Sequence, residues 1–226
     1  MIEKGRKTET EIMERALGEP IGSAPWAELA RGKKKVVIVT SDHTRPVPSR
    51  LTLPPLLREI RRAEPEAQIT ILIAVGSHRA TTREEMVEKF GADVVASERF
   101  INHDPHDPSI LTRLDPLPSG GELWLNRMAL EADLLVADGF IEPHQFAGFS
   151  GGRKSIMPGI AGLQTVLASH NAEFTVHPQA RSGNLEGNPF QTDMLNAARQ
   201  AGLAFILNVA LDAEKKVSAA FAGDFE

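Results

Sequence analysis

Three histidines lie at or beside polar loops of the sequence. They are His78 in the segment GSHR, His144 in EPHQ and His170 in ASHN. A single histidine is most often a surface or hydrogen-bonded core residue, but three in such positions favour a shared site. Two imidazoles on opposite sides of a substrate carbon can remove and return protons near neutral pH, and a third can bind a metal ion. His103 and His106 belong to NHDPHDP, where Asp and Pro favour turns, so we expect both to be solvated.

A lysine in the densest glycine stretch of the chain is the next candidate. Lys154 lies among Gly151, Gly152 and Ser155, in a polar loop rather than on a helix surface. Its amine can hold a cofactor covalently if its surroundings depress its pKa. A solvated lysine, or one that contacts an anion, fits the same pattern.

A charged pair lies in the segment SDHTRP, just after an apolar run. Arg45 is suited to bidentate binding of a carboxylate, and Asp42 is close to it in the sequence. A structural salt bridge, or an aspartate that caps the turn after a strand, explains the pair equally well.

The glycine-rich segment also matches two general motifs in part. A phosphate-binding P-loop needs a second glycine where Arg153 stands, so residues 148–155 do not complete that motif. The residues around Ser150 fit the G-x-S-x-G pattern of a nucleophilic serine, with His170 or His177 as its base, but several residues separate Ser150 from the preceding strand. A serine hydrolase that uses Ser150 and a non-catalytic nucleotide-binding module that uses these loop amides remain alternative functions.

The composition excludes several other classes of function. The 226 residues include 25 basic and 30 acidic side chains, for a net charge of −5, so the basic excess of a nucleic-acid-binding protein is missing. Without cysteine or tyrosine, the chain can form no disulfide, thiolate metal site or phenolic acid. Its apolar runs are far shorter than the roughly 20 residues that cross a bilayer, and the N-terminus has no secretory signal pattern. We therefore expect a cytoplasmic protein without a membrane span.

The elements that must position these residues follow from hydrophobic periodicity. Short apolar runs predict strands, helical spacing predicts helices, and Pro54 and Pro55 are expected only in the first turn of their helix. The predicted strands are 36–40, 69–75 and 133–140, and the predicted helices are 51–62, 83–90, 162–169 and 190–200. A hairpin (110–117 with 122–126) and a terminal strand pair (205–211 with 217–221) complete the prediction. This alternation indicates an α/β fold with a mostly parallel sheet and flanking helices.

Three polar loops follow the carboxyl ends of predicted strands. They are SDHTRPVP, GSHRATT and the long loop that begins with EPHQ. In open α/β sheets the ligand binds at this edge, so we expect one pocket built from the three loops.

These segments together resemble the family of nickel-pincer lactate racemases and related 2-hydroxy-acid racemases and epimerases. The matching segments are SDHTRPVP at 41–48, GSHR at 76–79, EPHQFAGFSGGRKSIMPGI at 142–160 and SHN at 169–171. The segment around Lys154 is long and specific. The resemblance implies a Rossmann-like N-terminal α/β domain that carries most of the site, with a second α/β domain that closes over it.

The resemblance also implies residue roles. His78 and His144 would be the acid/base pair that flanks the substrate, and Arg45 would contact its carboxylate. Lys154 would tether the cofactor, and His170 would be the protein's nickel ligand. One histidine would take the hydroxyl proton while hydride leaves the α carbon, so that a planar 2-keto acid forms and either enantiomer can be restored.

The cofactor implied by the resemblance is a nickel pincer derived from a pyridinium mononucleotide with thioamide and thiocarboxylate arms. Ser150, Gly151, Gly152 and Asp42 would lie around it. Its loading would require dedicated cofactor-synthesis proteins, and the substrate would be a small 2-hydroxy acid such as lactate. The sequence does not identify which hydroxy acid, nor the oligomeric state.

The family's full-length members are longer than this chain. We therefore expect residues 1–226 to be the N-terminal cofactor-binding domain of a two-domain racemase, without the C-terminal domain, as in a truncated protein. Such a fragment is expected to fold but to have little or no racemase activity.

Overall fold

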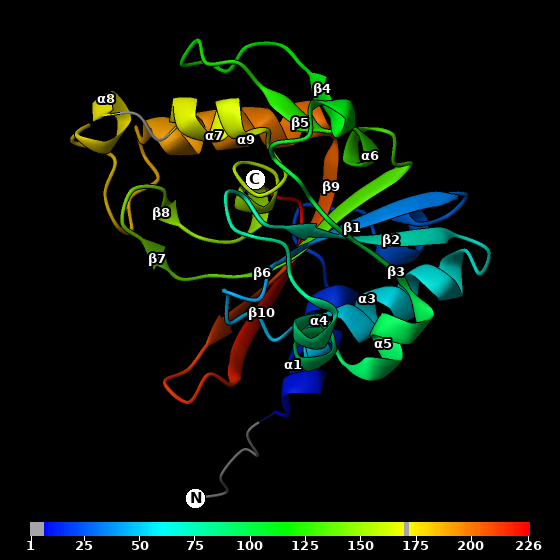
Figure 1. The fold of residues 1–226 in the computed structure, drawn as a ribbon. Helices are drawn as coiled ribbons and strands as arrows, with labels where there is room; N and C mark the ends of the chain where they lie inside the picture. The colour runs from blue at the N-terminus through cyan, green and yellow to red at the C-terminus, as the bar shows by residue number, and fades with distance from the viewer. Residues whose placement is uncertain (1–6, 170–171) are drawn as a thin grey trace, which may run out of the picture.

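A computed structural model describes residues 7–169 and 172–226 and contains a mostly parallel, six-stranded sheet (Figure 1). The strand order is β10-β9-β6-β1-β2-β3, and only the β9–β10 pair among these neighbours is antiparallel. The strands are β1 (Lys35–Ser41), β2 (Gln68–Ala74), β3 (Arg99–Asn102), β6 (Leu134–Phe140), β9 (Leu203–Leu211) and β10 (Val217–Gly223). The predicted α/β fold is confirmed.

Helices cover both faces of this sheet (Figure 1). The helices are α1 (Glu9–Gly18), α2 (Trp26–Leu29), α3 (Ser49–Ala63), α4 (Arg83–Phe90), α5 (Ala92–Ser97), α6 (Arg127–Leu130), α7 (Leu163–Ser169), α8 (Ala172–Thr175) and α9 (Pro189–Ala201). Helices α1, α3, α4 and α5 lie on one face, and α7 and α9 lie on the other. Successive residues of β1 therefore serve different cores: Val36 and Ile38 pack with the first group, and Val37 and Val39 with the second.

Smaller elements complete the chain. The pair β4 (Leu111–Arg113) and β5 (Trp124–Asn126) is antiparallel, which confirms the predicted hairpin in a shortened form. A second antiparallel pair joins β7 (Pro143–His144) to β8 (Gly148–Phe149), and the 3₁₀ helices are η1 (Pro108–Ile110) and η2 (Gly152–Ser155). Among the described residues, no helix is both long enough and apolar enough to cross a membrane.

The helix that follows β1 begins earlier than its apolar pattern predicts. Helix α3 starts at Ser49, so Pro54 and Pro55 lie in its second turn, and the prediction that they would lie in the first turn is wrong. The hydrogen bond from the Thr52 amide to the Pro48 carbonyl (3.2 Å) belongs to the turn before them. That polar first turn is not part of the apolar stripe, which is why periodicity alone missed it.

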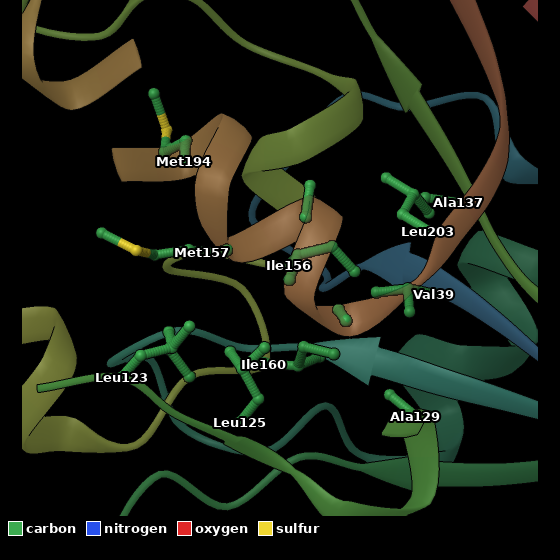
Figure 2. Packing of buried hydrophobic residues seen from close by; sticks show 14 of the residues in the cluster. Val39, Leu123, Leu125, Ala129, Ala137, Ile156, Met157, Ile160, Met194 and Leu203 are labelled. Carbon is green, nitrogen blue, oxygen red and sulfur yellow. The ribbon is translucent and has the colours of Figure 1, made fainter. Parts of the chain in front are cut away.

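Apolar residues that follow the glycine-rich loop anchor it to the core. They are Ile156, Met157 and Ile160, and no more than 1% of the surface of each is exposed. Figure 2 shows them among Val39 of the sheet and Leu125 of β5. Because close-packed side chains permit little displacement, this anchor limits where the preceding loop can lie.

The structure contradicts the expectation that His103 is solvated, whereas His106 is exposed as predicted. The His103 side chain is buried, with Nε2 2.9 Å from the Ala161 carbonyl and Nδ1 3.0 Å from Nδ2 of Asn126. The Nε2–H tautomer satisfies both contacts, since it donates to the carbonyl and accepts from the amide. Burial lowers the pKa of His103, which favours this neutral form.

Replacing His103 with Leu is therefore expected to lower the free energy of unfolding by about 2–4 kcal/mol, because it leaves two buried polar groups unpaired. Urea denaturation at neutral pH measures the change. The matched control, His106→Leu, should remain within about 0.5 kcal/mol of the parent protein.

The pH dependence of the free energy of unfolding provides a second test with the same variant. The folded-state pKa of His103 lies below its ordinary value of 6.5, so the unfolded state takes up the proton first as pH falls. The parent protein should therefore lose stability below pH 6.5, and His103→Leu should lose less over that range. An equal loss in both proteins would contradict the assignment.

Candidate active site

A cavity of about 420 Å³ lies at the carboxyl ends of the central parallel strands. The loops after β1, β2 and β6 and the turn η2 form its walls. Strands β1 and β6 are neighbours, but the chain continues from β1 to β2 on one side and from β6 to β9 on the other. Open α/β sheets bind ligands at the point where the strand order reverses in this way. The structure thus brings the three predicted loops to one pocket.

Most of the predicted site residues line this cavity. They are Asp42, Arg45, His78, His144, Ser150, Gly151 and Lys154. Gly152 is buried behind the wall, where its amide donates to Oδ1 of Asn208 (3.2 Å). His170 lies outside the described residues. Within the described part of the chain, no group of three His, Asp or Glu side chains is arranged to hold a metal ion.

A second cavity, of about 520 Å³, lies at the opposite, amino-terminal edge of the sheet. Its lining includes Arg61 and Glu98, which form an ion pair of 3.0 Å. None of the predicted site residues lines it. Volume alone would favour this cavity, but the clustering of titratable groups favours the smaller one.

A short hydrogen bond to a buried carboxylate orients His78. Nδ1 of His78 lies 2.6 Å from Oδ2 of Asp42, which is only 1% exposed. The hydroxyl of Thr44 (2.7 Å) and the Thr44 amide (3.0 Å) both donate to Oδ1 of Asp42 and hold it in place. The Nδ1–H of His78 therefore donates to Asp42, and Nε2 is the proton acceptor of the neutral ring.

The backbone also fixes the loop that carries His78. The Gly76 amide donates to the Gly159 carbonyl (3.0 Å), and the His78 amide donates to the Val75 carbonyl (2.8 Å). The first bond joins this loop to the segment that follows η2. Two walls of the cavity are thereby held at a constant distance.

The second cavity histidine is held in the opposite tautomer. His144 lies in β7, and its Nδ1 accepts from the amides of Ala147 (3.2 Å) and Phe146 (3.4 Å) in the turn before β8. An Nδ1 that accepts carries no proton, so the neutral ring has its proton on Nε2. His78 and His144 thus differ in tautomer, one able to accept at Nε2 and the other able to donate there.

Lys154 lies in η2 and is half-buried. Burial is the main cause that lowers its pKa to about 8, and the charges of Arg45 and Arg153 act in the same direction. The carboxylate of Glu142 opposes them. At pH 7 about a tenth of such an amine is neutral, which makes it a competent nucleophile.

A tight turn positions this lysine. Gly151 precedes η2 at a φ of +84°, and a Cβ atom there would lie 2.9 Å from the Phe140 carbonyl. Only glycine combines that backbone conformation with so close an approach. The positive φ turns the chain after β8, next to the carboxyl end of β6, and η2 begins at the following residue.

Ser150 closes the same loop through its hydroxyl group. Its Oγ donates to the Phe140 carbonyl (2.9 Å) and accepts from the Glu142 amide (2.9 Å). These bonds favour a structural role over an activated nucleophile. The turn η2 is also a single 3₁₀ turn rather than the start of a long helix, so the loop differs from a P-loop in structure as well as in sequence.

Sequence reasoning missed Thr44, Asp138 and Lys89, each of which lines the cavity or contacts a residue that lines it. Thr44 follows Asp42 at the spacing typical of an Asx turn, so its contact was readable in the sequence. Asp138 is a buried carboxylate in the apolar strand β6, a position where a charge is unusual. Lys89, on α4, left no signal, because a lysine on an amphipathic helix normally faces solvent.

Comparison with known proteins identifies relatives of this chain. The family model described as lactate racemase N-terminal domain matches residues 2–183. The lactate racemase of Thermoanaerobacterium thermosaccharolyticum is 56% identical over 223 residues, which are 99% of this chain and 52% of that protein. The lactate racemase of Lactiplantibacillus plantarum is 52% identical over 219 residues, which are 97% of this chain and 52% of that protein.

Two solved structures show the same architecture. The lactate racemase apoprotein from T. thermosaccharolyticum superposes with a TM-score of 0.96 at 57% identity, over 97% of this chain and 52% of that one. A Thermotoga maritima protein superposes with a TM-score of 0.71 at 25% identity, over 98% of this chain and 56% of that one. The chain spans about half the length of the curated relatives that it matches. The matched residues and the identity to these relatives establish that the chain belongs to the lactate racemase N-terminal domain family.

Proposed function

We propose that this chain provides the catalytic site of a racemase or epimerase of 2-hydroxy acids, with lactate as the first substrate to test. The observation that carries the proposal is the pair of cavity histidines held in opposite tautomers. One of them can remove a proton while the other supplies one, as inversion at a carbon with a hydroxyl group requires. Membership of the family and the identity to two lactate racemases support the same activity.

The chain's own residues account for substrate binding and proton transfer. Arg45 lies on the cavity wall, where its guanidinium would bind the substrate carboxylate. Nε2 of His78 would accept the hydroxyl proton from one enantiomer, and Asp42 would stabilise the imidazolium that results. When the opposite enantiomer forms, the imidazolium form of His144 would return a proton from Nε2 to the oxygen, while His78 would release its proton to solvent. In the reverse direction the two histidines would exchange roles, each acting through Nε2.

Proton transfer alone does not invert the α carbon, because loss of its hydrogen as a proton would leave a carbanion beside a carboxylate. We propose that the site takes a nickel-pincer nucleotide, which supplies the acceptor and donor of hydride when bound. Lys154 would hold it covalently, with Ser150, Gly151, Gly152 and Asp42 around it and His170 as nickel ligand. The donor set fits, because the Lys154 amine lines the cavity and has a depressed pKa.

The proposal also concerns the proteins that supply the cofactor and the length of chain that full activity requires. Cofactor-synthesis proteins would be needed to produce the loaded form. Because the chain spans about half of each curated relative, we propose that it is the cofactor-binding domain and that full turnover requires a length comparable to theirs.

In a cofactor-loaded protein that contains this chain and has the length of the curated relatives, replacing His78 or His144 with Ala should abolish racemisation in at least one direction. The loss should be at least about 100-fold, because general acid/base groups typically contribute 10²–10⁴-fold. Chiral chromatography of D- and L-lactate measures the two directions separately. Intact mass of each variant should show that the cofactor is still attached.

The exposed His106 provides the matched control, since His106→Ala removes an imidazole at a distance from the cavity. It should racemise lactate at the parent rate. Parent rates in both directions for His78→Ala and His144→Ala would refute the acid/base assignment.

The depressed pKa of Lys154 can be tested on the protein without cofactor. Acetylation by a water-soluble active ester should modify Lys154 at least about tenfold faster than exposed lysines at pH 7, because far more of its amine is neutral. Peptide mass spectrometry against pH should give a midpoint near 8. Arg45→Gln removes a charge that lowers this pKa, so its midpoint should shift upward. A midpoint near the ordinary lysine value in the parent protein would show that Lys154 is not activated.

A further inference from the structure

Helix α4 connects two of the loops that build the cavity. At its first turn, the Glu85 carboxylate accepts two bonds from the Arg79 guanidinium (2.8 and 2.5 Å) and one from the Thr82 amide (2.8 Å). These contacts fasten the loop that carries His78. The last turn of α4 reaches the loop after β1 through one side chain, that of Lys89.

Lys89 binds the backbone of that second loop. Its Nζ donates to the Arg45 carbonyl at 2.8 Å and to the Val47 carbonyl at 3.3 Å. The same loop begins with Asp42, whose own carbonyl accepts from the Arg45 amide (3.3 Å). The ammonium group thus holds the loop at Arg45 and at Val47, a few residues after the aspartate that orients His78.

The positive charge of Lys89 also interacts with two buried carboxyl groups. Burial lowers the pKa of Lys89, whereas the carboxylates of Asp138 and Asp42 act in the opposite direction. Asp138 is fully buried, and its Oδ2 accepts from the hydroxyls of Thr52 (2.6 Å) and Ser49 (3.3 Å) at the start of α3. Burial raises the pKa of Asp138, and the positive charge of Lys89 acts in the opposite direction.

The loop needs such a fixed point. The Arg45 side chain is exposed and can adopt many rotamers, so the position of its guanidinium depends on where the backbone holds its Cα atom. Small displacements of a positioning group can cost large factors in rate or affinity. A charged donor that binds two carbonyl groups of this loop restricts that displacement more than a neutral donor would.

We propose that Lys89 is a positioning residue that fixes the loop of Asp42 and Arg45, and thereby both the orientation of His78 and the placement of the carboxylate-binding guanidinium. The part that concerns Arg45 rests on the proposed function. The part that concerns His78 does not, because it follows from the hydrogen bond between His78 and Asp42.

The first test is a proton NMR measurement on the chain without cofactor. In the parent protein, the Nδ1 proton of His78 should give a downfield resonance protected from exchange by Asp42. Lys89→Met should broaden or remove this resonance, while the amide spectrum of the sheet is retained. Lys89→Arg, which keeps a charged donor, should restore it at least in part, and Arg83→Met removes a cation from the exposed face of the same helix and should leave it unchanged. Lys89→Gln gives the same test if Lys89→Met fails to fold.

The second test is a double-mutant cycle on a cofactor-loaded protein that contains this chain and has the length of the curated relatives. Lys89→Met should raise the KM for lactate by about tenfold, and most of this effect should disappear in an Arg45→Lys background, because the two substitutions would act through one contact. A His78 resonance that persists in Lys89→Met, or effects on KM that simply multiply, would overturn the inference. If Lys89→Met loses the His78 resonance but the parent protein itself shows no racemisation, the inference about His78 holds and the proposed function is wrong.

Discussion

The parallel pairing of the central strands is the constraint on which the site depends. Because β2, β1, β6 and β9 run in the same direction, their carboxyl ends meet at one edge. Loops that are separated by as many as about a hundred residues in the sequence therefore become neighbours. The two core clusters on either face keep the strands in register, and the apolar anchor after η2 fixes the third wall. The chemistry of the cavity thus depends on packing at some distance from it.

Within this frame, local hydrogen bonds determine what each side chain can do. Asp42 orients His78 from a buried position, whereas backbone amides orient His144, and the two arrangements favour opposite tautomers. Burial lowers the pKa of Lys154 and prepares its amine to react. His78 and Lys154 are thus held in states that bulk water would favour less, and the surrounding fold supplies the stability that this requires.

Several features of the fold and of the site were predictable from the sequence because their causes are local. Apolar runs located β1, β2 and β6, and the polar loops that follow them contain His78, His144 and Lys154. Other features arise from contacts between distant segments. The sequence around His103 resembles a solvated turn, yet Ala161 and Asn126 make it a core residue. The roles proposed for the site residues, His170 among them, remain predictions.

Short elements were missed for a related reason. The edge strand β3 (Arg99–Asn102) has too few residues for a periodic pattern, and pairing with β2 defines it. The N-terminal helix α1 begins with a capping box formed by Thr8 and Glu11, a signal that was present in the sequence but lies in a polar segment. Lys89 shows the limit most clearly, because nothing in its local sequence indicates that its ammonium group contacts a loop more than forty residues away.

The proposed hydride transfer depends on covalent attachment of a nickel-bearing nucleotide to Lys154. Intact mass, peptide mapping and metal analysis of the protein produced together with cofactor-synthesis proteins test it most directly. We predict a nucleotide-sized adduct on Lys154 and equimolar nickel. An unmodified mass without nickel, obtained while the lactate racemase of T. thermosaccharolyticum produced alongside is fully loaded, would contradict it.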